Sequence, residues 1–122
     1  MTEAHLAQTM KQHDRILIVK EPWLNLILSG EKTIEVRGTP YRPGHYFVGH
    51  NQLIRGEIVL GVAKQVRTED EWNFLRPRHR VPSATLPYRK TYALPVVSVQ
   101  RVAPTPFVHP RGAVNIVKYR RA

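Results

Sequence analysis

Short apolar runs separated by polar turns with Gly and Pro follow one another along the chain, and their spacing predicts a protein made mainly of strands. We expect strands over residues 15–20, 33–37, 45–50, 56–63, 91–102 and 113–119. The first run is rich in β-branched residues, and residues 56–63 are apolar on both faces, which predicts a central strand. Pro95 should confine its strand to a sheet edge or a bulge, because proline has no N–H to donate.

Residues 22–30, PWLNLILSG, have the pattern of a short helix that ends just before a strand. Pro22 suits the first turn, and Gly30 suits a left-handed cap after the last turn. Trp23 and Ile27 are four residues apart, so they should lie on one apolar stripe against the core. This spacing favours a core position for Trp23 over a ligand-binding one.

A second short helix is predicted to start at Thr68, because Thr68 and Glu71 have the spacing of a capping box. It should end before Pro77. The segment over residues 76–90, RPRHRVPSATLPYRK, is rich in Pro and Arg and has no periodicity, so we expect a long loop. Loops of this length in small domains are usually functional or mobile. If this one folds over a cleft it is a lid, and otherwise it is a solvated basic loop.

These elements predict an α+β protein dominated by a small β-barrel or strongly curved sheet, with about six strands and two short helices. The chain of 122 residues suits a single domain over residues 15–122, and residues 1–14 are expected to be a frayed or weakly helical lead-in. No apolar run approaches the roughly 20 residues that span a bilayer. There is no cysteine for a disulfide. We therefore expect a soluble, cytoplasmic protein with no membrane partner.

Positive charge is concentrated in the second half of the chain. Residues 1–61 carry seven Lys or Arg and six Asp or Glu, whereas residues 62–122 carry twelve and three. The basic residues that follow the last acid, Glu71, are Arg76, Arg78, Arg80, Arg89, Lys90, Arg101, Arg111, Lys118, Arg120 and Arg121. Most are arginine, whose planar guanidinium suits phosphate, so a polyanionic partner is expected. Their scatter through strands and loops favours nucleic acid over a membrane. The alternative is that the charge only keeps a small protein in solution.

The stretch over residues 29–37, SGEKTIEVR, holds the strongest candidate for a site. Lys32 lies at the start of a predicted strand, and Glu35 and Arg37 share the polar face of that strand. A carboxylate between cations stays ionised and can act as a base or an anchor, and a shielded amine has a lowered pKa. We therefore identify Lys32 and Glu35 as candidate catalytic residues, and the alternative is an exposed ladder of salt bridges. The chain has no phosphate-loop, metal-ligand or nucleophile motif, so no metal or cofactor is expected.

Several segments together resemble a known family. Residues 18–23, IVKEPW, precede the helix ending LILSG, and the EKTIEVR that follows completes a pattern similar to the G-x-K-x-x-E-x-R signature of the ASCH domain. A looser similarity continues through residues 56–66, the pair Glu71 and Trp72, and residues 92–104 to the closing strand. Nearly all of the chain from residue 15 to residue 119 is thus similar to ASCH domains, which have a PUA-like β-barrel fold.

The resemblance implies a cleft beside the signature strand, suited to nucleic acid or a nucleotide-like ligand, with Lys32, Glu35 and Arg37 at its wall. The family is mostly described as RNA-binding or coregulatory. Some of its members resemble enzymes, including ribonucleases and amidohydrolases that deacetylate N4-acetylcytidine. In the amidohydrolase branch a threonine stands three positions after the motif lysine, where this chain has Glu35. That branch also uses a glutamate of the later helical region, for which Glu69 or Glu71 would be the counterpart.

The first functional hypothesis is binding of RNA or another single-stranded nucleic acid, with one base in the cleft and the phosphates on the basic half. The residues predicted to make this contact are Lys20, Arg37, Tyr41, His50, Arg76, Arg78, Arg80, Arg89 and Lys90. Tyr41 lies in a Pro-flanked turn after the signature strand, which suits stacking on a base. The second hypothesis is a hydrolase that uses Lys32 and Glu35 on RNA or a modified nucleoside. The third is a basic accessory protein of a ribonucleoprotein particle.

Overall fold

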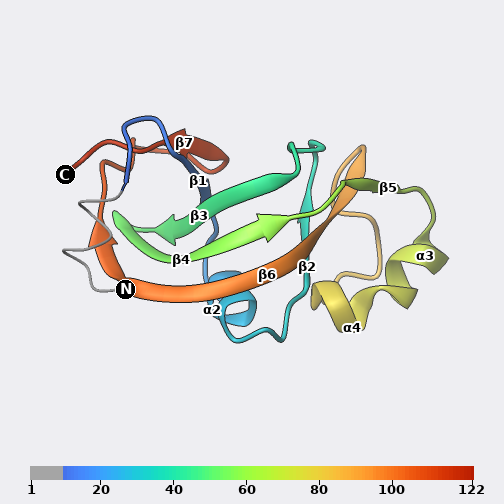
Figure 1. Cartoon of the computed structure of the whole chain (residues 1–122). Coiled ribbons are helices and arrows are strands. Elements are labelled where there is room, and N and C mark those ends of the chain that lie inside the picture. The colour runs from blue at the N-terminus through green and yellow to red at the C-terminus, as the bar shows by residue number, and fades with distance from the viewer. Residues whose placement is uncertain (1–9) are drawn as a thin grey trace.

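A computed structural model describes residues 10–122, and Figure 1 shows one strongly curved sheet with α3 and α4 at one end and α2 below its middle. The described strands are β1 (Arg15–Ile18), β2 (Ile34–Arg37), β3 (Gly44–His50), β4 (Leu53–Leu60), β5 (Lys64–Val66), β6 (Thr91–Pro106) and β7 (Ile116–Lys118). The described helices are α2 (Trp23–Leu28), α3 (Glu69–Phe74) and α4 (Arg76–His79). Residues 1–9, which are most of the predicted lead-in, lie outside the described residues.

The strands of residues 10–122 form one sheet of seven, in the order β2-β6-β4-β3-β1-β7, with β5 also paired to β6. The β1–β3 pair is parallel, and the other pairs are antiparallel. The α+β fold class is therefore confirmed, as is the central position of β4. Two elements were not predicted. They are the short strand β5 and the helix α4, which occupies the first four residues of the expected loop over residues 76–90.

The long strand β6 joins the two parts of the sheet (Figure 1). Its residues 96–106 pair with β4, and its residues 91–95 pair with β2 and β5. An edge position for Pro95 is therefore wrong, but the alternative of a bulge is confirmed, because the β4–β6 register shifts between Val59 and Leu60. The Pro95 carbonyl accepts from Gly61 N–H at 2.8 Å, next to this register shift.

Helix α2 is held by its apolar side against the sheet. Leu24, Ile27 and Leu28 are buried in one core cluster with side chains of β1, β3 and β4. A Cβ on Gly56 of β4 would lie 2.5 Å from Leu28 Cδ2, so glycine lets α2 approach the strand closely. The predicted left-handed cap is confirmed at Gly30, whose φ is 82°. The helix therefore ends where expected and directs the chain into β2.

Helix α3 begins at the predicted cap, because the Thr68 hydroxyl accepts from Glu71 N–H at 3.1 Å. The Glu71 carboxylate reaches back to Arg67 N–H at 3.3 Å. Trp72 of this helix is fully buried against Ile34 and Val36, which lie on one face of β2. This contact leaves the opposite face of β2 for Glu35 and Arg37. No helix among residues 10–122 is long and apolar enough to cross a membrane.

Candidate functional site

A cavity of about 640 Å³ opens beside β2, in the size range of small-molecule sites. Its lining residues come from four separate segments of the chain, within residues 18–23, 32–41, 81–88 and 114–115. The end of β1, the signature strand, the segment after α4 and the segment before β7 therefore share one cavity. From the sequence alone, only the segments within residues 18–23 and 32–41 were expected to lie at the same site.

Lys32 lies at the base of this cavity with only 1 % of its surface exposed. Its Nζ donates to the His79 carbonyl at 2.5 Å and lies 3.5 Å from Glu35 Oε1. The same ammonium is 5.2 Å from the centre of the Trp23 ring, a cation–π contact. Burial lowers the pKa of Lys32, and the Glu35 carboxylate opposes that shift. The site thus contains a desolvated amine that its neighbours hold in one position.

Glu35 is also buried, at 5 % exposure, and both of its oxygens are occupied. Oε1 accepts from Val36 N–H at 3.2 Å and faces Lys32, and Oε2 accepts from Arg37 Nε at 3.0 Å and Nη2 at 2.8 Å. A carboxylate has about four lone-pair sites, so these partners use its full acceptor capacity. Glu35 therefore anchors the two cations, and it can accept a substrate proton only if one of these partners moves.

Arg37 of β2 reaches the end of β1 and the segment before β7, and neither of these pairs with β2. Nη2 donates to the Ile18 carbonyl at 2.6 Å, and Nη1 donates to the Val114 carbonyl at 2.9 Å. In the strand order β2 stands at one end, while β1 and β7 stand at the other. The guanidinium therefore closes the curled sheet at the cavity, where these two ends approach each other.

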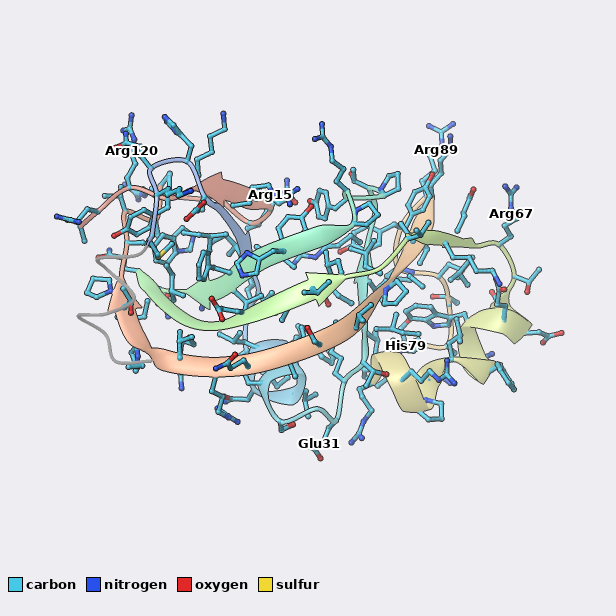
Figure 2. All side chains as sticks on the ribbon, viewed as in Figure 1. Arg15, Glu31, Arg67, His79, Arg89 and Arg120 are labelled. Atoms are coloured by element: carbon cyan, nitrogen blue, oxygen red, sulfur yellow. The ribbon has the colours of Figure 1, made fainter. Side chains whose placement is uncertain are left out.

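His79 holds the other side of Lys32. Its ring stacks on Trp72 with 3.8 Å between centroids, and its Nδ1 accepts from Val81 N–H at 2.9 Å. Because Nδ1 is an acceptor, the ring is neutral with its proton on Nε2, which lies 2.9 Å from the Trp72 carbonyl. Burial lowers the pKa of His79, and the nearby charges of Lys32 and Arg76 act in the same direction. Figure 2 shows His79 between α4 and the sheet.

Aromatic side chains form the walls of the cavity above these charges. Trp23, Tyr41 and Tyr88 all line it. Trp23 also packs against the core cluster of α2, so the core position predicted for it holds only in part. The Tyr41 hydroxyl donates to Asn115 Oδ1 at 3.0 Å, and burial raises the pKa of this phenol. The cavity therefore offers flat apolar surfaces around a charged base.

The structure brings together five of the residues predicted from the sequence. Those that line the cavity are Lys20, Lys32, Glu35, Arg37 and Tyr41. Those outside its lining are His50, Arg76, Arg78, Arg80, Arg89 and Lys90. The interpretation of SGEKTIEVR as an exposed ladder of salt bridges is wrong, because Lys32 and Glu35 are buried.

The residues outside the cavity have several different surroundings. The His50 ring lies at the C-terminal end of β3, 6.0 Å from the ring of His109. Arg76 donates to the Val81 and Ser83 carbonyls and so fixes the segment after α4. Arg78, Arg80, Arg89 and Lys90 are exposed, and Figure 2 shows Arg89 pointing away from the molecule. Neither Glu69 nor Glu71 lines the cavity.

The segment over residues 76–90 forms one wall of the cleft. Val81, Pro87 and Tyr88 line the cavity, and Trp72 Nε1 donates to the Ser83 carbonyl at 2.7 Å. Residues 76–90 are therefore not a loop free in solvent, because part of this segment packs against the cleft as one of its walls. Sequence reasoning missed His79 and Asn115 altogether, because a lone histidine in RPRHR and a lone asparagine before a strand carry no pattern.

Comparisons with known proteins agree with this geometry at the level of fold. No family model matches the sequence, and no curated protein matches it significantly. The structure is similar to ASCH from Zymomonas mobilis, with a TM-score of 0.70, 14% identity and 90% of each chain covered. The chain has the ASCH-domain fold. Crystal structures of the Y47F and S128A mutants of the same Zymomonas mobilis protein match with TM-scores of 0.70 and 0.69, at 14% identity. They cover 89% of this chain and 91% and 89% of theirs. The PUA-like α+β class expected from the ASCH resemblance is confirmed.

Replacing Arg37 by Lys should destabilise the fold by about 2–4 kcal/mol, because an ammonium cannot make the same planar set of bonds to Glu35 and two carbonyls. Chemical denaturation measures the free energy of unfolding. The matched variant Arg89→Lys changes an exposed arginine and should stay within about 0.5 kcal/mol of wild type. Equal stability of Arg37→Lys and wild type would show that sheet closure does not depend on the guanidinium.

Acidification should destabilise the fold through His79. Its pKa in the folded protein is lowered from 6.5, so below pH 6.5 the unfolded chain binds a proton that the folded chain does not. The stability that the neutral His79 ring contributes to the folded state is therefore fully present above pH 6.5. It is lost as the pH falls toward the pKa of His79 in the folded protein. Denaturation between pH 7.5 and about 5 measures this slope. It should become shallower in His79→Gln. A slope that His79→Gln leaves unaltered would assign the titration to another group.

Proposed function

We propose that this protein binds RNA or another single-stranded nucleic acid by taking one base into the cavity beside β2. The observation that supports this most directly is the cavity of about 640 Å³ walled by Trp23, Tyr41 and Tyr88. Base stacking on aromatic side chains is the common mode of single-strand recognition, and it tolerates different bases. Polar groups at the base of the cavity, foremost Lys32, would orient the ring that enters.

The distribution of charge supports the same proposal. Lys20 lines the cavity at its exposed rim, and Arg89 and Lys90 directly follow the lining residue Tyr88. Phosphates on either side of a bound base would meet these side chains, which contribute affinity without selecting sequence. The three acidic residues of the second half are Glu69, Asp70 and Glu71, which lie in helix α3 and do not line the cavity. Among residues 10–122, the acids that line the cavity are Glu35, which is paired with Arg37, and the exposed Glu21 next to Lys20.

A hydrolase is the second candidate, and the buried amine of Lys32 is the observation that favours it. An amine with a lowered pKa can serve as a base or nucleophile near neutral pH. The occupied oxygens of Glu35 argue for Lys32 as the group that meets the substrate, with Glu35 as the anchor that positions it. The candidate substrates are single-stranded RNA and acylated cytidine.

RNA binding should be sensitive both to salt and to Tyr41. The affinity for a fluorescently labelled, mixed-sequence single strand should fall at least about tenfold between roughly 50 and 200 mM salt. Tyr41→Ala should weaken binding about tenfold by removing one stacking surface. The control Phe74→Ala removes an exposed aromatic ring of α3 outside the cavity and should have no such effect. An affinity that salt and Tyr41→Ala both leave unchanged would contradict the proposal.

The hydrolase candidate predicts turnover by the wild-type protein of single-stranded RNA or of N4-acetylcytidine, detected by chromatography of the products. Lys32→Met should abolish turnover while filling the same buried space. The matched variant Lys64→Met changes an exposed lysine of β5 and should retain it. If the wild type turns over neither substrate, the second candidate falls and the binding proposal is unaffected.

A further inference from the structure

The hydrogen-bonding groups left free beside Lys32 and Asn115 are mainly donors, whereas the exposed Glu21, which also lines the cavity, accepts from Asn25 N–H with one carboxylate oxygen and keeps the other free. The Glu35 oxygens are occupied by Val36, Lys32 and Arg37. The carbonyls of Ile18 and Val114, which also belong to lining residues, accept from Arg37. Around Lys32 and Arg37, these acceptors are thus already used.

Donors remain on two sides of the cavity. Lys32 has three N–H bonds: one goes to the His79 carbonyl and one faces Glu35, and the third has no acceptor among residues 10–122, with the Trp23 ring 5.2 Å from Nζ. Asn115 lines the cavity, and its amide N–H₂ has no partner among residues 10–122. The rim residue Lys20 adds a further donor.

The direction in which the Asn115 amide points is set by its neighbours. The Tyr41 O–H donates to Asn115 Oδ1 at 3.0 Å. With Oδ1 engaged in this way, Asn115 presents its N–H₂ group, and not its carbonyl, to a ligand.

We propose that the cavity selects bases by their carbonyl oxygens, so that uracil and guanine bind in preference to cytosine and adenine. The inference rests on the proposed function, since it assumes that a base enters the cavity. Uracil presents two carbonyl acceptors and guanine presents O6 and N7, whereas cytosine and adenine carry an exocyclic amino donor. Beside Lys32 and Asn115, where the Glu35 carboxylate is already saturated, that amino group meets donors and loses the hydrogen bonds it has in water.

The test compares four mononucleotides that share the ribose and phosphate and differ only in the base. The full-length protein is titrated with UMP, CMP, GMP and AMP, and the dissociation constants are measured by calorimetry. UMP should bind at least about tenfold more tightly than CMP, and GMP at least about tenfold more tightly than AMP, because one unmatched polar group costs that much.

Two variants examine the Asn115 amide. Asn115→Asp replaces the N–H₂ donor by an acceptor of the same shape and should remove the preference for UMP over CMP. Tyr41→Phe keeps the ring but removes the hydroxyl that fixes the amide, so the preference should weaken. The matched control Asn51→Asp makes the same change at an exposed turn residue outside the cavity lining and should preserve it. A preference that Asn115→Asp leaves intact would overturn the role of this amide.

The outcomes separate this inference from the function on which it rests. If all four nucleotides bind with equal affinity, the preference for carbonyl-bearing bases is overturned, and the binding proposal is judged by its own test with labelled RNA and Tyr41→Ala. If CMP or AMP binds more tightly than its partner, the preference is likewise overturned. If none of the four binds while labelled RNA does, recognition uses another surface, and both the base-binding cavity and its preference fall.

Discussion

One buried ion pair closes the curled sheet. Glu35 and Arg37 lie on the same face of β2, and the guanidinium reaches the carbonyls of Ile18 and Val114 at the far end of the strand order. These ends are not paired through their backbones in the described part of the chain. Their separation leaves an open cavity, and the side chains that bridge them form its floor. The closure of the fold and the candidate site therefore share the same atoms.

Charged groups this deeply buried are costly unless each has partners in place. Lys32 meets a carbonyl, a carboxylate and an aromatic face, and Glu35 meets two cations and a backbone N–H. Removing one member would leave another charge uncompensated, so the cluster is held in a single arrangement. This arrangement fixes where the remaining N–H of Lys32 points before any ligand arrives. Helix α4 contributes through the His79 carbonyl, which links the cluster to the stacked pair of His79 and Trp72.

Much of the fold was predictable because its elements depend on local patterns. The end of α2 at Gly30, the cap at Thr68 and the central apolar strand follow from spacing along a few residues. Pro95 was placed at an edge or a bulge, and only the structure shows that a register shift accommodates it inside the sheet. The helix α4 was missed because RPRH has no apolar period, and its stability comes from packing against α3 and β2.

The sequence by itself determined the α+β class, the resemblance to ASCH domains and the choice of Lys32, Glu35 and Arg37 as unusual residues, because alternation and motif spacing act over short distances. It placed Tyr41 beside them for the same reason. Only the tertiary structure decided that these charges are buried, that Glu35 is saturated and that His79 and Asn115 belong to the site. Those facts depend on contacts between segments far apart in the chain, such as Lys32 with His79 and Tyr41 with Asn115. No local pattern specifies such contacts, since they form only when the curled sheet brings its two ends together.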